Sequence, residues 1–139
     1  MKNIVIYAVV FFVLLSFCGC GAQGQERVRI LQDQSLLNRF YEENGTVHML
    51  CTIKVENETK EAVEVTITAF SREDMIGGLL EDARMPGFNP ERGDGYFTIP
   101  ADSVTELLVD FRGTFGGKAQ KADRLVPDVL ELSVVSVLP

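Results

Sequence analysis

His48 and Cys51 are the first residues to consider for chemistry, because they lie three positions apart in one segment. Histidine and cysteine together can bind a metal ion, and with a neighbouring base or carboxylate they can act in nucleophilic catalysis. Both belong to a run in which apolar residues recur at every second position from Val47 to Val55, which is the period of a β-strand. Successive side chains of a strand point to opposite faces, so His48 and Cys51 cannot hold one ion. We expect His48 to be half exposed and Cys51 to lie in the core as a small apolar residue.

Two later segments have the composition of ligand-binding loops but lack the groups that such loops require. The segment from Arg112 to Ala119 contains Gly-Gly-Lys, yet a phosphate loop needs glycine in place of Arg112 and serine or threonine in place of Ala119. A calcium loop needs six to eight oxygen ligands, whereas Asn89, Glu91 and Asp94 supply few. The sequence therefore predicts no metal and no cofactor. With a single histidine, it gives little support to a small hydrolase or a metal-dependent enzyme.

Two asparagines begin the pattern Asn-x-Thr that marks an N-glycosylation acceptor. Asn44 is followed by Gly45-Thr46, and Asn57 by Glu58-Thr59. Asparagine, glycine and threonine are also ordinary turn residues. We expect both asparagines to lie in turns.

The first residues have the features of an export signal. Lys2 precedes an unbroken apolar run from Ile4 to Leu15, and small residues follow this run. The run is too short for a membrane-spanning helix, which needs about 20 residues. We therefore expect residues 1–19 to be a cleaved signal peptide.

The end of this signal resembles the lipobox of bacterial lipoproteins. Gly19 precedes Cys20, as a small residue precedes the lipid-carrying cysteine in that family. The resemblance implies lipid attachment at Cys20, with Cys18 as the alternative and residues 20–26 as a tether. Ordinary cleavage after Ala22 or Gly24 is the rival, and it would release a secreted or periplasmic protein.

Composition limits what the remainder of the chain can be. The whole chain carries a net charge of −7, which disfavours binding to nucleic acid phosphates. Cys51 is the only cysteine beyond the signal and the tether, so a disulfide framework is excluded and a hydrophobic core must stabilise the fold. We expect residues 27–139 to form a single domain.

The expected fold is organised around two alternating apolar segments, Val47–Val55 and Val63–Ala69. The polar stretch Asn57–Lys60 between them has the length of a hairpin turn. Other elements are expected on both sides. These are strands at 28–30, 96–99, 104–111 and 129–138, a helix or a strand at 34–44, a short helical connection after Ser71 and an irregular loop at 86–95. The segment 34–44 favours a helix, and the alternative is a strand that ends in an Asn44-Gly45 turn. The last strand is apolar on both faces, which predicts a central or covered position.

Short strands joined by turn signals are typical of an all-β fold, and we expect an antiparallel β-sandwich of about six to seven strands with one or two short helical connections. The segments Ile53–Val65 and Phe97–Phe111 resemble the strand–asparagine–turn–strand and the later proline–alanine turn of immunoglobulin-like domains in bacterial envelope lipoproteins. FxLYD-type domains and late-embryogenesis sandwich domains have this outline. The resemblance implies a fold and a location but no catalytic residues.

These observations favour an exported, lipid-anchored bacterial envelope protein that acts as a non-catalytic binding module. Its partner would be another envelope protein or an extracellular polymer. Within the excursion at 71–95 we expect Met85, Phe88 and Arg92 to contact that partner, because aromatic and arginine side chains dominate binding hot spots. The alternative for Phe88 is that it closes the end of the sandwich. A second hypothesis is a structural or assembly subunit whose exposed strand pairs with a partner chain.

Overall fold

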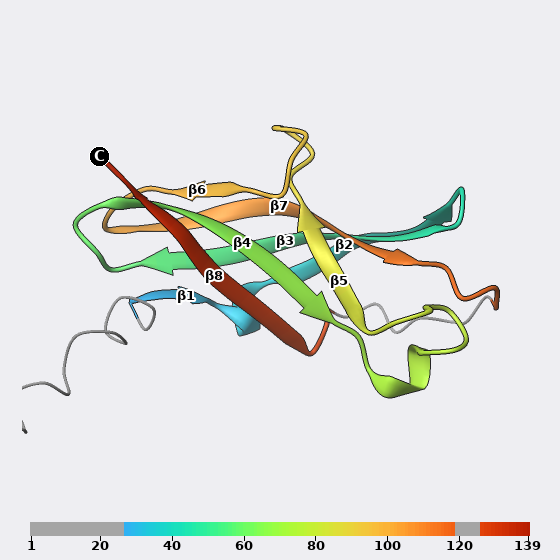
Figure 1. The fold of residues 1–139 in the computed structure, drawn as a ribbon. Helices are drawn as coiled ribbons and strands as arrows, with labels where there is room; N and C mark the ends of the chain where they lie inside the picture. Colours follow the sequence, from blue (N-terminus) through green and yellow to red (C-terminus); the bar gives the residue numbers. More distant parts are fainter. Residues whose placement is uncertain (1–26, 119–125) are drawn as a thin grey trace, which may run out of the picture.

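The structure, a computed structural model, describes residues 27–118 and 126–139, which form an antiparallel arrangement of strands with a β-sandwich outline (Figure 1). The described part contains eight strands and two single 3-10 turns. The strands are β1 (Val28–Ile30), β2 (Leu36–Glu43), β3 (Thr46–Asn57), β4 (Ala62–Phe70), β5 (Arg84–Phe88), β6 (Phe97–Ile99), β7 (Ser103–Thr114) and β8 (Val129–Leu138). The turns are η1 (Gln32–Gln34) and η2 (Glu73–Met75). The expected fold class is confirmed, with one or two strands more than the sequence indicated.

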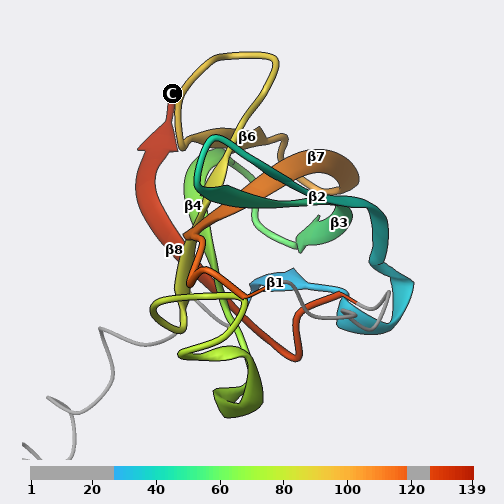
Figure 2. The same cartoon turned by 90° about the vertical axis from the view of Figure 1, so that its right-hand side faces the viewer.

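The strands form two groups that β5 connects. In the first group, β3 pairs with β1 and β2 along one edge and with β7 along the other. In the second group, β4 pairs with β8, β6 and the first residues of β5. The last residues of β5, Gly87 and Phe88, pair with β7 instead. Figure 1 shows β5 running from the end of β4 towards β7, and Figure 2 shows β4 and β8 on one side of the fold with β3 and β7 on the other.

The core lies between the two groups and follows the alternation read from the sequence. Every second residue of β3 and of β4 is buried. Cys51 belongs to this set, as expected, and so do the residues of the neighbouring strands that face inward. The largest fully buried side chains include Phe97, Phe111, Ile53, Ile67, Leu80 and Met85.

The expected hairpin between β3 and β4 is not formed. The register of β3 is with β1, β2 and β7, and that of β4 is with β5, β6 and β8, so the polar stretch after β3 carries the chain from one group of strands to the other. Two strands that each have one apolar face, joined by a short polar stretch, fit both a hairpin and a crossing between sheets. The sequence pattern therefore does not distinguish the two arrangements.

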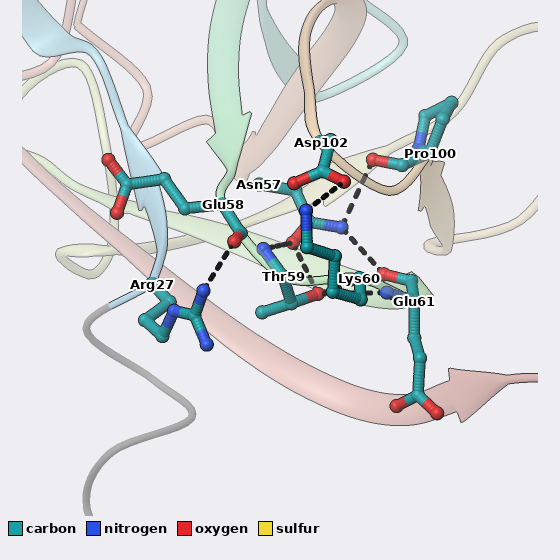
Figure 3. A network of polar contacts seen from close by, with 8 residues as sticks. All are labelled: Arg27, Asn57, Glu58, Thr59, Lys60, Glu61, Pro100 and Asp102. Atoms are coloured by element: carbon teal, nitrogen blue, oxygen red, sulfur yellow. Dashed lines mark hydrogen bonds and ion pairs between the residues drawn. The ribbon is translucent and has the colours of Figure 1, made fainter.

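Hydrogen bonds of the Asn57 side chain stabilise the segment that crosses from β3 to β4, as Figure 3 shows. Its side chain is 1% exposed, and its Nδ2 donates to the carbonyl oxygens of Glu61 at 2.9 Å, Pro100 at 3.0 Å and Ile99 at 3.3 Å. Its Oδ1 accepts from the backbone N–H and the hydroxyl of Thr59 at 2.9 and 2.7 Å. The two segments that carried the resemblance therefore meet at Asn57. Because the amide is buried and fully engaged, Asn57 is not accessible as a glycosylation acceptor.

The helix favoured for residues 34–44 is wrong, and the alternative is correct. This segment is β2, and it reverses into β3 through Asn44 and Gly45, whose φ angles are 51° and 78°. Two successive positive φ angles are typical of the tight turn that Asn-Gly favours in hairpins. A register irregularity between Leu37 and Arg39 shifts the alternation by one residue, so that Leu37 and Phe40, which are three positions apart, both face the core from one strand.

The irregular loop expected at 86–95 begins only after Phe88. Residues 84–86 pair with β4, and Gly87 lies so close to that strand that an added Cβ would stand 2.5 Å from the Ile67 carbonyl oxygen. The true loop follows Asn89, whose side chain binds the backbone of Glu91 and Tyr96. Ahead of β5, the single turn η2 takes the place of the short helix expected after Ser71.

β8 is not the central or covered strand that its composition suggested. Its described ladder is with β4 alone, and Val129, Val135 and Val137 are each about half exposed. Val135 falls at a register irregularity opposite Glu64 and Val65, where the strand has one extra residue. The apolar residues on its outer side therefore face solvent at an edge of the described fold.

Candidate functional site

The three residues expected to contact a partner do not form one surface. Met85 is fully buried in the core, so it cannot contact a partner from the folded protein. Phe88 is partly buried beside β7, whereas Arg92 forms ion pairs at 3.1 Å with Glu64 of β4 and with Asp94. Met85 and Phe88 belong to the strand β5, whereas Arg92 lies in the loop that follows it.

A different set of side chains comes together on the outer face of β2, β3 and β7. Cross-strand pairing aligns Tyr41 with His48 and His48 with Arg112. The next row aligns Arg39, Leu50, Asp110 and Phe88 across four strands. We call six of these residues the cation–aromatic ladder: Arg39, Tyr41, His48, Asp110, Arg112 and Phe88.

Contacts run through the ladder without interruption. The Arg39 guanidinium lies 4.6 Å from the centre of the Tyr41 ring, and that ring stacks on His48 at 4.6 Å with the planes 2° apart. Nδ1 of His48 donates to Asp110 Oδ2 at 2.9 Å, and Nε of Arg112 donates to the same oxygen at 2.7 Å. The Arg112 guanidinium lies 3.6 Å above the centre of the Phe88 ring.

Asp110 is the centre of this arrangement. It is only 4% exposed, although it lies on the outer side of β7, because its neighbours cover it. A buried carboxylate is costly unless it is paired and hydrogen-bonded, and here His48 and Arg112 both bind it. The carboxylate therefore fixes the orientation of the imidazole and the guanidinium.

The same carboxylate acts on the buried thiol behind it. Burial, and secondarily the charge of Asp110, raise the pKa of Cys51 from its ordinary value of 9.0 to about 12. A nucleophilic cysteine needs a lowered pKa, so Cys51 is in the opposite state. Its position in the core agrees with the interpretation drawn from the alternating pattern.

The ladder has the composition of a recognition surface. It presents two guanidinium groups and three aromatic rings from strands, which hold them more rigidly than loops would. Exposed apolar side chains, Leu36, Val104 and Leu108, lie on the same outer side of β2 and β7. The His48–Asp110 pair also resembles half of a hydrolytic triad, but among the described residues no serine hydroxyl bonds to His48. No group of three His, Cys, Asp or Glu side chains able to hold a metal occurs in residues 27–118 and 126–139.

The sequence named Phe88 as a contact residue and placed His48 on the outer side of its strand, but it did not identify the ladder. His48 is more covered than the half exposure that the alternation predicts, because its side chain is 12% exposed. Asp110 lies 62 positions from His48, and nothing in the alternation of either strand signals that the two would be neighbours. Tyr41 and Arg39 were assigned to a helix, which removed them from the face on which they lie. The available signal was the Asn44-Gly45 pair, because a hairpin there places Tyr41 opposite His48.

No model of a known protein family matches this chain, and neither a curated protein nor a solved structure matches it. The described residues contain no helix long and apolar enough to cross a membrane. Cys20 and Cys18, the expected sites of lipid attachment, lie outside the described residues, as do the signal peptide and the tether.

Proposed function

We propose that this chain is an exported, lipid-anchored bacterial envelope protein that works as a non-catalytic binding module. Its partner is another envelope protein or an extracellular polymer, and the outer face of β2, β3 and β7 is the surface that binds it. The observation that carries this proposal is the cation–aromatic ladder, with the buried carboxylate of Asp110 at its centre.

Physical chemistry supports the ladder as a binding surface. Arginine and tyrosine are enriched among residues that dominate binding energy, and cations over aromatic rings contribute most when water is excluded. Stacking and hydrogen bonding already hold Tyr41, His48 and Arg112 in place. Side chains that are ordered before binding lose less conformational entropy on association, which favours affinity.

The anchoring part of the proposal rests on the basic start, the apolar run and Gly19-Cys20. The Cys20→Ser variant lacks the thiol that would carry the lipid, so we expect it to leave the membrane fraction for the soluble fraction. Cys18→Ser is the matched control and should remain with the membrane. A Cys20→Ser protein that still carries label from a radioactive fatty acid would contradict lipid attachment at this residue.

Binding through the ladder is tested by a double variant at its exposed end. Arg39→Gln with Tyr41→Leu removes a cation and a ring without touching Asp110, and Leu preserves much of the buried volume. We expect retention of envelope material on the immobilised full chain to fall at least tenfold, with the melting temperature within a few degrees of the parent. Lys60→Gln, which removes an exposed ion pair with Asp102, is the control. Equal retention by the double variant and the parent would refute the ladder as the binding surface.

A second candidate function has one observation in its favour. The exposed valines of β8 lie on an edge strand, and edge strands can accept a strand from another chain. In this case the protein would be a structural or assembly subunit. The irregularity at Val135 disfavours this use, because an extra residue interrupts the regular row of backbone groups that pairing requires.

A further inference from the structure

A polar hollow opens where β5 passes from β4 to β7. β5 pairs with β7 only at Gly87 and Phe88, and its earlier residues pair with β4, so the start of β5 diverges from the end of β7. The hollow in this fork has a volume of about 450 Å³ and is lined by Arg84, Arg112, Thr46, Thr114, Asp82 and Pro86. This volume falls within the range of ligand sites. Arg112 belongs both to the hollow and to the cation–aromatic ladder.

The charged groups of the hollow are available to an anion. Arg84 is exposed, and in the part of the chain that the structure describes its guanidinium has no hydrogen bond or ion pair. Asp82, the acidic residue of the lining, accepts from the backbone N–H of Arg84 at 2.9 Å. Arg112 uses Nε for Asp110, its side chain is 40% exposed, and among the described residues its terminal nitrogens make no hydrogen bond. The hollow thus concentrates two guanidinium groups on a chain whose net charge is −7.

We propose that this hollow binds a carboxylate-bearing sugar of an extracellular polysaccharide, with Arg84 and Arg112 on the carboxylate. This inference rests on the proposed binding function and names the chemistry of its ligand. Guanidinium groups bind carboxylates through two parallel hydrogen bonds, which gives both strength and direction. The hydroxyls of Thr46 and Thr114 supply donors and acceptors for sugar hydroxyls beside them.

An acidic peptide fits the hollow less well than an acidic sugar. Peptides add to sheet edges through backbone N–H and C=O groups, and Pro86 in the lining has no N–H to offer. Peptide segments also bind through apolar side chains that enter pockets, whereas the lining here is mainly charged and hydroxylated. A ligand rich in hydroxyls and carboxylates matches these groups.

The test is calorimetric titration of the full chain in detergent with a hexamer of galacturonic acid. We expect the hexamer to bind the parent and to bind Arg84→Gln at least tenfold more weakly. Arg112→Lys keeps the charge beside Asp110 but loses the planar fork, so we expect a loss of similar size with an unchanged fold by circular dichroism. Arg92→Gln is the matched control, because Arg92 pairs with Glu64 on a different strand group, and its affinity should equal that of the parent.

Three outcomes would overturn the inference. They are equal affinity of the parent and Arg84→Gln, equal affinity for a neutral galactose hexamer, and equal affinity for a hexamer of glutamate, which would assign the hollow to peptides. If the galacturonate hexamer fails to bind the parent, this ligand class is wrong, while loss of envelope retention by the Arg39→Gln/Tyr41→Leu variant would still support the ladder as a binding surface.

Discussion

At the scale of single residues, the buried polar groups of Asn57 and Asp110 join segments that the apolar alternation does not relate to one another. The alternation in β3 and β4 correctly assigned the inward faces of Cys51, Ile53 and Val65. The alternation did not predict the burial of Asp110 or Asn57, because a strand pattern shows which side a residue faces and not which residues it contacts there. Both residues are buried only because partners from distant segments satisfy their hydrogen bonds.

Asn57 gives the sharpest test at this scale. Asn57→Asp preserves shape but removes both amide hydrogens, so the carbonyls of Glu61, Ile99 and Pro100 lose their donor and face a buried negative charge. We expect the free energy of unfolding to fall by about 3 kcal/mol or more, measured by chemical denaturation. Asn44→Asp in the exposed turn is the matched control and should change it by less than about 1 kcal/mol. Similar decreases in the free energy of unfolding of the two variants would contradict the role of Asn57 in stabilising the segment that crosses from β3 to β4.

The raised pKa of the Cys51 thiol predicts that the protein loses stability at alkaline pH. Its pKa is raised to about 12 in the folded protein, from an ordinary value of 9.0, so the folded state keeps the thiol proton over a range where the unfolded chain loses it. The contribution of the protonated Cys51 thiol to the free energy of unfolding is therefore fully present below pH 9. It is lost as the pH rises from 9 towards 12, at no more than about 1.4 kcal/mol per pH unit. Unfolding free energies of the parent and Cys51→Ala, measured at intervals across this range, should converge as the pH rises. Parallel curves would show that burial does not hold the thiol protonated.

At the scale of elements, the sequence predicted the long alternating strands well and the connections between them poorly. β3, β4 and β7 were found near their true bounds, because each has an alternating face that packs towards the core. β5 was missed because its proline and glycine are turn residues in most settings. In this fold the proline and the glycine lie in a strand that pairs first with β4 and then with β7. The two neighbouring strands determine this change of partner, and the sequence of the segment itself does not show it. The burial of β8 was overestimated for a related reason, since composition does not show which strands lie at an edge.

Gly87 tests the account of β5. Gly87→Ala would place a methyl group 2.5 Å from the Ile67 carbonyl oxygen and 2.9 Å from a Val109 methyl carbon, so β5 would have to move away from its neighbours. We expect the unfolding free energy to fall by about 2–4 kcal/mol, consistent with overpacking against a backbone atom that cannot rotate away. Gly95→Ala is the control, because the nearest atom to its added Cβ is 3.4 Å away. Thermal melts that show equal stability for the two variants would mean that β5 does not approach β4 as closely as described.

At the scale of the whole molecule, two surfaces are candidates for binding a partner. The outer face of β2, β3 and β7 carries ordered cations and aromatic rings, and the polar hollow adjoins it through Arg112. The outer side of β8 carries exposed valines and an irregular edge. Neither surface was predicted from sequence, because each depends on which strands are neighbours in space. The expectation of a binding module on a β-sandwich came from the sequence, and the proposal that the ladder face is its binding surface rests on the arrangement of side chains in the structure.

The most direct measurement of the central claim is site-specific photocross-linking in living cells that express the full chain. A benzophenone side chain replaces Leu108, which is 38% exposed on the ladder face, or Val137, which is 55% exposed on β8. Benzophenone inserts into C–H bonds, so it captures protein and polysaccharide alike. Our account predicts a high-mass adduct from position 108 that disappears in the Arg39→Gln/Tyr41→Leu background, and no adduct from position 137. An adduct formed only from position 137 would contradict the account and assign the interaction to edge-strand pairing through β8.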